Sequence, residues 1–441
     1  MISPAHHLAA SPPVWRFARA AALGFLCAAF CTGKVHAATP QPDSTLQVLH
    51  WWTSASERKA ASLLAARMAD EGITWRDAGI PGGAGIGAGK VLKSRVLAND
   101  APEVTQIIGV SIREWADLGF LLELDKVAAA NKWNTSFFPT IQNLIQHRKH
   151  VVAAPLGIHR INTLFYNKKI FSTLRLSPPE NWDELVAVAA RLKAAGLIPL
   201  AQSSEPWQVA TLFENLILAE GGPEYHRELF VKQNAQAVMD KRFSHALERL
   251  RQMKGWMNNP VDERPWTEVV RQFSKNEAAM MITGDWVKGE LNDGGFATDE
   301  AFSCTAMPGT GKYHLYSVDT FSMFTNDYSR IAAQEKLARL VATPAVQADY
   351  NAVKGSVSVR RDADPVRMDS CARASWTAFA LGATTQAPSL VHRMATDETS
   401  KDAIIAVIHR YFIDATVSSA DTQARLVAIY KTFGNNKKQT P

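Results

Sequence analysis

The sequence predicts an α/β protein with two lobes, each a sheet flanked by helices. Segments in which apolar and polar residues alternate, as in strands, are followed by segments with apolar residues at helical spacing. This order of strand and helix repeats along the chain. About 400 residues follow an N-terminal export signal, which is more than one hydrophobic core usually organises. Two lobes would leave a cleft between them, and such a cleft is the natural place for a ligand.

Residues 1–37 predict the export signal. Their only charges are basic, and these charges flank an uncharged apolar run at residues 20–31. This run is too short to span a bilayer as a helix. Residues 35–37, Val-His-Ala, are typical of a signal peptidase site, so we expect the mature chain to begin near Ala38, outside the cytosol. A lipid anchor on Cys31 is the less favoured alternative.

The net charge of the mature chain limits the classes of partner that it can have, and its cysteine count predicts a disulfide. Removing the signal removes three of the six net positive charges, and the remainder is too balanced to indicate a nucleic acid or an anionic membrane as partner. Cys304 and Cys371 are the two cysteines that remain. An even count in an oxidising compartment predicts a disulfide, which would stabilise the fold by roughly 4 kcal/mol in the chain-entropy model.

The first unit joins a strand at residues 46–51 to a helix at residues 57–70. Apolar residues alternate along the first segment and recur at helical spacing along the second. Residues 54–57, Ser-Ala-Ser-Glu, form a capping box in which Glu57 would accept from a free amide at the helix start. Alternatively, this carboxylate faces a ligand and accepts hydrogen bonds from it.

Later units follow the same rhythm, and no internal repeat is visible. The strands that we predict after the first unit are residues 103–108, 162–166 and 278–283. The predicted helices are residues 111–118 and 181–195, the second of them capped by Gly196. From about residue 362 the chain is predicted to be mostly helical.

A glycine-rich run at residues 81–90 invites comparison with a phosphate-binding loop. It does not match that motif, because Ala84 stands where its first glycine belongs and Val91 follows Lys90 in place of Ser or Thr. A dinucleotide turn is equally unfavourable in an exported protein. We interpret the run as a surface loop that leads into a helix near Lys90, and we predict no cofactor.

The strongest clue to function is the tandem pair Trp51 and Trp52, which lies between the first predicted strand and the helix that follows it. The CH-rich faces of a pyranose can lie on indole, while its hydroxyls need donors and acceptors in a water-depleted site. Trp286 directly follows the strand at residues 278–283, at the end where α/β clefts form. Asp319 either caps a turn or faces a ligand. For any single tryptophan, a place in the core is the more common alternative.

No set of residues in the sequence indicates a catalytic or metal centre. The mature chain has no Gly-x-Ser-x-Gly and no Cys-x-x-Cys. The close pair His147 and His150 favours a solvated turn over a ligand set. A glycosidase would need two carboxylates with separated pKa values, and no pair stands out. We predict neither catalytic residues nor a metal.

These motifs together resemble the periplasmic solute-binding proteins of ABC sugar importers, most closely the glucose-binding subgroup. The resemblance covers nearly the whole mature chain and rests on the order and spacing of the motifs. Its motifs are His50-Trp-Trp-Thr-Ser54 with Glu57, the glycine-rich run into Val91–Arg95, Glu114–Gly119, Ile158–Asn162, Asn181–Glu184, Pro206–Gln208, Gly284–Gly289, Pro308–Thr310, Val318–Phe321, Lys354–Ser356 and Pro388–His392.

The resemblance implies a set of ligand-binding residues. The implied aromatic contacts are Trp51, Trp52, Trp266 and Trp286. The implied hydrogen-bonding residues are Glu57, Gln106, Asp319, Lys354 and His392. The carboxylates accept, the ammonium group donates, and the amide and imidazole can do either, so the set matches the hydroxyls of a sugar.

The sequence departs from the family pattern at several positions. Ile108 stands where the glucose binders usually carry a lysine or histidine that touches the sugar. Losing a charged donor would cost on the order of 1.5 to 3 kcal/mol for a ligand that needs it. Val209 and the segment at residues 203–205 also differ from the pattern. Glucose is therefore the first candidate, with sugar preference open.

The resemblance also implies an architecture and a role. Its fold is two lobes that are discontinuous in sequence, joined by crossover hinge segments, with closure around the ligand. We expect an N-terminal lobe at residues 45–155 with 312–352, and a C-terminal lobe at residues 156–311 with 353–436. The implied protein is a periplasmic monomer that delivers a monosaccharide to the permease subunits of an ABC importer.

Other functions stay open at this point. An exported carbohydrate-active enzyme would use Glu57 and Asp319 as acid and base. The same transport role could serve a disaccharide, a polyol or an amino sugar. Docking to a chemoreceptor could accompany transport and leaves no mark in the sequence.

Overall fold

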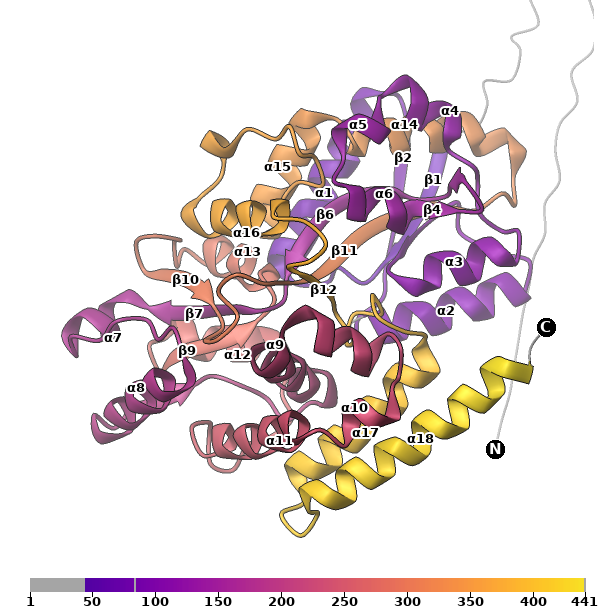
Figure 1. The fold of residues 1–441 in the computed structure, drawn as a ribbon. Coiled ribbons are helices and arrows are strands. Elements are labelled where there is room, and N and C mark those ends of the chain that lie inside the picture. Colours follow the sequence, from indigo (N-terminus) through magenta and orange to yellow (C-terminus); the bar gives the residue numbers. More distant parts are fainter. Residues whose placement is uncertain (1–43, 83–84, 440–441) are drawn as a thin grey trace, which may run out of the picture. The chain divides into compact units, whose positions relative to one another are not determined.

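Two β-sheets with helices packed around them form the framework of the computed structural model (Figure 1). The structure describes residues 44–82 and 85–439. The predicted export signal at residues 1–37, including Cys31, lies outside the described residues. The predicted α/β class is confirmed, because each sheet is mixed and is flanked by helices.

The first sheet has six strands in the order β12-β11-β3-β1-β2, with β6 paired to β11. Strand β11 runs antiparallel to both β3 and β6, and parallel to β12. Strand β1 runs parallel to β2 and to β3. The strands are β1 (Thr45–His50), β2 (Thr74–Gly79), β3 (Val104–Ile107), β6 (Ala154–Arg160), β11 (His314–Met323) and β12 (Gln386–Pro388).

Helices pack against the first sheet around one hydrophobic core. Helix α1 (Ala55–Asp70) shows why: Ala60, Leu64 and Met68 recur at helical spacing and are fully buried in this core. The other helices that contribute to it are α2 (Ile86–Leu97), α3 (Val110–Asp117), α4 (Asp125–Ala130), α5 (Trp133–Ser136), α6 (Pro139–Ile145), α14 (Ile331–Val341), α15 (Pro344–Lys354) and α16 (Ser370–Ala380).

The second sheet has four strands in the order β10-β7-β9-β8. Its strands are β7 (Thr163–Asn167), β8 (Ile198–Leu200), β9 (Ala278–Thr283) and β10 (Phe302–Ala306). All residues of β9 are buried, as expected for a strand covered on both faces. The remaining helices are α7 (Lys168–Thr173), α8 (Trp182–Ala194), α9 (Pro206–Phe230), α10 (Ala235–Val238), α11 (Lys241–Lys254), α12 (Trp266–Ser274), α13 (Trp286–Asp293), α17 (Glu398–Ile413) and α18 (Ser419–Gln439).

The chain crosses between the sheets at two places that matter for the site. It leaves the first sheet at the end of β6 and enters β7 after only residues 161–162. It returns from β10 to β11 through residues 307–313. The predicted lobe boundaries, which divide the chain near these crossings, stay a prediction.

The predicted disulfide is confirmed. Cys304 on β10 and Cys371 in the first turn of α16 are bonded, with their Cα atoms 5.7 Å apart. The bond ties α16, which also packs on the first core, to an edge strand of the second sheet.

Most predicted elements are present with ends shifted by a few residues. The strand predicted at residues 278–283 is β9 itself. The helix predicted to start near Lys90 begins earlier, at Ile86, because Gly85 already adopts the left-handed conformation before the first turn. The helical C-terminal part is interrupted by the short strand β12.

The predicted turn around His147 and His150 is confirmed as the tip of a hairpin, β4 (Gln146–His147) and β5 (His150–Val151). Nδ1 of His150 lies 2.6 Å from a carboxylate oxygen of Asp125 and 3.4 Å from one of Glu123. Exposed clusters of this kind are common without a metal ion, and we assign none.

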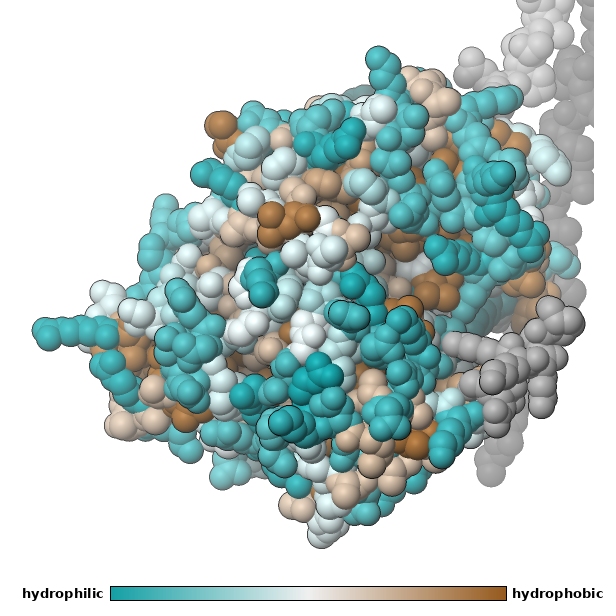
Figure 2. All heavy atoms as spheres, in the orientation of Figure 1, coloured by the Kyte–Doolittle hydropathy of each residue, from teal (hydrophilic) through white to brown (hydrophobic). Residues whose placement is uncertain are grey.

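The surface is mainly hydrophilic on the face shown in Figure 2, where hydrophobic side chains lie in separate small groups. Within residues 44–82 and 85–439, no helix combines the length and the apolar character needed to cross a membrane.

Candidate ligand-binding site

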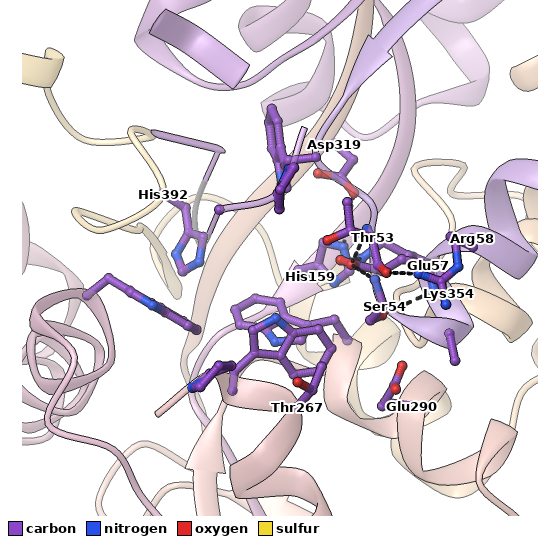
Figure 3. Close-up of a pocket in the computed structure, with 18 of the residues that line it drawn as sticks. Thr53, Ser54, Glu57, Arg58, His159, Thr267, Glu290, Asp319, Lys354 and His392 are labelled. Carbon is purple, nitrogen blue, oxygen red and sulfur yellow. Dashed lines mark hydrogen bonds and ion pairs between the residues drawn. The ribbon is translucent and has the colours of Figure 1, made fainter. Parts of the chain in front are cut away.

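A cavity of about 570 Å³ lies between the two sheets (Figure 3). Its walls come from the β1–α1 turn, from β6 and β11 of the first sheet, and from α12 and α13 on either side of β9. The volume falls within the range of small-molecule sites, roughly 300 to 1,000 Å³. We call it the ligand cavity.

Most of the predicted ligand residues line this cavity. They are Trp51, Glu57, Trp266, Trp286, Asp319, Lys354 and His392. Ile108, the departure from the family pattern, also lies on the wall and is 2 % exposed. Segments that are distant in sequence therefore converge on one space, whereas ligand binding by these side chains stays a prediction.

Trp52 lies in the core of the first sheet and not on the cavity wall, in contrast to the prediction. It is 1 % exposed, and its ring centroid lies 5.1 Å from that of His50, 5.5 Å from Phe321 and 5.8 Å from Tyr350. Successive residues at a strand end point to opposite sides. Trp51 therefore lines the cavity while its neighbour is buried in the core.

Gln106 supports the cavity from behind and does not line it. Its Nε2 donates to Oδ1 of Asp319 at 3.0 Å, and its Oε1 accepts from the backbone N–H of Trp51 at 3.3 Å. It is 3 % exposed, on strand β3 beside β11. The structure thus places Gln106 as a positioning residue for the side chain of Asp319 and the backbone of Trp51.

Glu57 combines the two roles that the sequence left open. One carboxylate oxygen accepts from the backbone N–H groups of Thr53 and Ser54 at 3.1 and 3.2 Å, which completes the capping box. The other oxygen lies 3.4 Å from Nζ of Lys354, the last residue of α15. Because Glu57 also lines the cavity, its cap fixes the carboxylate in the wall (Figure 3).

His159 on β6 links two carboxylates at the base of the cavity. Its Nδ1 lies 2.5 Å from Oδ1 of Asp285, and its Nε2 lies 3.3 Å from Oδ2 of Asp319. All three side chains are buried. Since each ring nitrogen faces a carboxylate oxygen, both nitrogens must carry a proton, so the ring is an imidazolium.

The pKa shifts agree with this assignment. Burial and the nearby Lys354 charge act to lower the pKa of His159, but Asp285 and Asp319 raise it overall. Burial acts to raise the pKa of Asp319, but the hydrogen bond and charge of His159, the charge of Lys354 and the bond from Gln106 lower it overall. The Asp319 carboxylate is therefore ionised and can accept from a ligand hydroxyl.

Trp286 forms the centre of an aromatic cluster in the wall. Its ring centroid lies 5.1 Å from His392, 5.6 Å from His159 and 6.4 Å from Trp207. The rings meet at interplanar angles of 47° to 72°, so they brace one another at their edges. The cluster holds Trp286 in a fixed orientation at the cavity.

His392 presents a hydrogen-bond acceptor. Oγ of Ser389 donates its proton to Glu214 at 2.8 Å, so it accepts from Nδ1 of His392 at 3.0 Å. Burial, with the charges of His159 and Arg393 acting in the same direction, lowers the pKa of His392 to about 3. A neutral ring that donates through Nδ1 keeps Nε2 free of a proton.

Polar contacts also join α1 to α13 beside the cavity. The backbone N–H and Oγ of Ser56 donate to Oε2 of Glu290 at 3.1 and 2.9 Å. Nζ of Lys59 lies 2.9 Å from Oδ1 of Asp293. Because α1 packs on the first sheet and α13 follows the second, these contacts tie the two halves together.

Several residues of the wall were not predicted from the sequence. His159 and Trp207 belong to motifs that carried the resemblance, but the motifs alone gave no reason to place either side chain at a ligand. The other unpredicted polar residues of the wall are Thr53, Ser54, Arg58, Glu205, Thr267, Arg271, Glu290 and Ser317.

The chain belongs to the bacterial extracellular solute-binding protein family, whose model matches residues 38–348. A probable sugar-binding periplasmic protein of Brucella suis is 32 % identical over 410 residues, which are 92 % of this chain and 97 % of that protein. A probable sugar-binding periplasmic protein of Rhizobium meliloti is 31 % identical over 385 residues, which are 87 % and 92 % of the two chains.

Solved structures share the fold at low sequence identity. The bacterial solute receptor AcbH, described as having an exclusive preference for β-D-galactopyranose, superposes with a TM-score of 0.76 at 16 % identity, covering 89 % of this chain and 99 % of the other. RafE in complex with raffinose gives a TM-score of 0.70 at 18 % identity, covering 88 % and 99 %. The predicted two-lobed solute-binding fold is therefore confirmed.

The placement of Trp52 predicts a loss of stability on truncation. Trp52→Ala should lower the free energy of unfolding by about 3 to 5 kcal/mol, because it empties a large space in the first core. Urea unfolding of the purified mature chain would measure this. Trp266→Ala, at a half-buried residue of the cavity wall, is the matched control and should cost less. Equal losses would contradict the core placement of Trp52.

The His159 imidazolium predicts a pH dependence of stability. Since the folded chain holds this proton more tightly than the unfolded chain, its stabilisation is complete below about pH 6.5 and is lost as the pH rises through the raised pKa of His159. Unfolding free energies from pH 6 to 9 should therefore fall less in His159→Gln than in the unsubstituted protein. His245→Gln, at an exposed histidine, should keep the unsubstituted profile.

Proposed function

We propose that this solute-binding protein captures a neutral monosaccharide, with glucose as the first candidate, and delivers it to the permease of an ABC importer. The ligand would lie in the ligand cavity, in the periplasm, and would leave chemically unchanged. The names of the Brucella and Rhizobium relatives, both called probable sugar-binding periplasmic proteins, support the sugar class.

The observation that carries this proposal is the composition of one cavity wall. Indole surfaces from Trp51, Trp266 and Trp286 share it with the ionised carboxylate of Asp319 and the ammonium group of Lys354. A pyranose needs both kinds of contact, because its CH faces are apolar and its hydroxyls both donate and accept.

The polar groups of the wall are held in place before any ligand arrives. Asp319 is bonded to His159 and Gln106, and Glu57 is bonded to its own helix cap and to Lys354. Groups that are already ordered lose little entropy on binding, which favours affinity. This arrangement supports capture of a small ligand of fixed shape.

The enzyme alternative receives no support from the carboxylates. A glycosidase needs one carboxylic acid that keeps its proton near neutral pH, which requires a raised pKa. The pKa of Asp319 is lowered, so this group is a poor general acid. We therefore propose binding without bond cleavage.

A second candidate function is capture and delivery of a sugar that lacks a hydroxyl at the position facing Ile108. Ile108 gives the wall a methyl-rich surface where a charged donor would suit a hydroxyl. A deoxyhexose or a pentose would leave no hydroxyl unpaired at such a surface.

Calorimetry on the mature chain with glucose, galactose, xylose and fucose tests both candidates. We expect saturable binding of at least one of these sugars. A sugar panel that gives no heat, beside tight binding of a solute of another class, would overturn the proposal.

Truncating the indole of Trp51 tests the location of the site. Trp51→Ala should weaken binding of the sugar identified above at least tenfold, because the ring supplies an apolar platform in the cavity wall. Trp182→Ala is the matched control, since this half-buried indole packs on Trp256 away from the cavity and should keep the affinity. Titration of both variants checks the prediction, and an unchanged Kd for Trp51→Ala would contradict it.

Replacing Ile108 tests the choice of sugar. If glucose is the ligand, Ile108→His should tighten its binding about tenfold or more, because a donor worth roughly 1.5 to 3 kcal/mol is restored. Ile108→Leu keeps an apolar wall and should leave the affinity for glucose nearly unchanged. Weaker glucose binding by the histidine variant than by the leucine variant would instead favour the deoxyhexose or pentose candidate.

A further inference from the structure

A second cavity of about 240 Å³ lies on the other side of strand β6 from the ligand cavity. Its wall includes Arg160, the residue after His159, since neighbouring residues of a strand point to opposite faces. Residues of β7, β10, α13 and α16 complete it, and the disulfide lies in its wall. We call it the Arg160 cavity.

Arg160 is a buried cation without a carboxylate partner. Its side chain donates from Nε to Oδ1 of Asn162 at 3.3 Å and from Nη2 to the carbonyl of Tyr313 at 2.9 Å. Among the described residues, no carboxylate forms an ion pair with it and its Nη1 has no hydrogen-bond acceptor. Arg160 is only 6 % exposed. Buried charges are normally paired, so the unbonded Nη1 of this one is available to an anion from outside the chain.

The other charged groups of the wall already have partners within the chain. Lys288 is buried, and its Nζ lies 2.6 Å from Oδ2 of Asp369. Asp285 is the carboxylate of this wall, but its two oxygens already face His159 and the backbone N–H of Arg160. Both carboxylates in reach of the cavity are thus engaged, while part of the Arg160 guanidinium is not.

The wall also offers neutral groups that suit an anion. Thr305 brings a hydroxyl from β10 and Ser375 brings one from α16, whereas the hydroxyl of Thr163 on β7 already donates to the backbone carbonyl of Arg160 at 3.1 Å. The volume equals about eight liquid water molecules at roughly 30 Å³ each, which is enough for a tetrahedral anion with part of its hydration.

We propose that the Arg160 cavity binds a small inorganic oxyanion, such as sulfate or phosphate, through the free edge of the Arg160 guanidinium. The planar guanidinium matches the oxygens of such an anion better than a lysine ammonium does. Burial, opposed in part by Asp285, lowers the pKa of Arg160 to about 10, which reflects the cost of a buried guanidinium that an anion would offset. This site is separate from the ligand cavity.

Titration with sodium sulfate or sodium phosphate against sodium chloride at equal ionic strength tests the proposal on the mature protein. Sulfate or phosphate should give a saturable one-to-one heat and a saturable rise of the unfolding midpoint. Arg160→Gln should lose both effects, and Trp51→Ala should keep both. Arg160→Lys should retain only a weakened effect, because it keeps the charge without the planar fork.

Three outcomes would overturn the site. A rise that is equal in Arg160→Gln and does not saturate is the general stabilisation by excluded salts. An equal saturable effect of chloride would overturn the oxyanion class. Loss of the effect in Trp51→Ala would place the anion in the ligand cavity instead. If neither Arg160 variant folds, a crystal of the unsubstituted protein soaked in selenate should show anomalous density beside Arg160, and density elsewhere alone would refute the proposal.

Discussion

The ligand cavity depends on one buried cation, the imidazolium of His159. It lies on β6, close to the point where the chain leaves the first sheet, and it faces carboxylates from both halves of the molecule. Asp319 belongs to β11 of the first sheet, and Asp285 follows β9 of the second. Without the ring between them, the two buried carboxylates would lose the cation that both of them face at the base of the cavity. The same interaction therefore keeps Asp319 ionised and holds the two halves in register.

Three polar side chains of the wall share a pattern in which another group of the chain anchors them from behind. Gln106 anchors Asp319, the helix cap anchors Glu57, and Ser389 anchors the ring of His392. Anchored groups keep their geometry when water or a ligand exchanges in the cavity, because their orientation is set by bonds within the chain. The polar side chains of the cavity wall thus reach their orientation when the chain folds, before a ligand binds.

The sequence predicted most of the elements because strands and helices follow from local rules, whereas the wall residues that it named came from the resemblance to the family. Periodicity located the strand and helix that flank Glu57, and Ser54 gave the start of that helix. Trp52 was misplaced because two adjacent tryptophans at a strand end cannot both face one side. His159 was missed since its partners lie 126 and 160 positions away, and no spacing within a single motif reveals such contacts.

Anchoring also determines where ligand preference can change without damage to the fold. Substituting Asp319 would remove one of the two carboxylates that face His159, and substituting Lys354 would remove the cation beside Glu57, so either change costs stability as well as a contact with the ligand. Ile108 has no polar partner, and its neighbours in the wall impose only a limit on size and polarity. A change there alters the chemistry offered to the ligand while the anchored network stays intact. Ile108, one of the positions at which the sequence departs from the pattern of the glucose binders that it resembles, is thus one at which the fold tolerates a change.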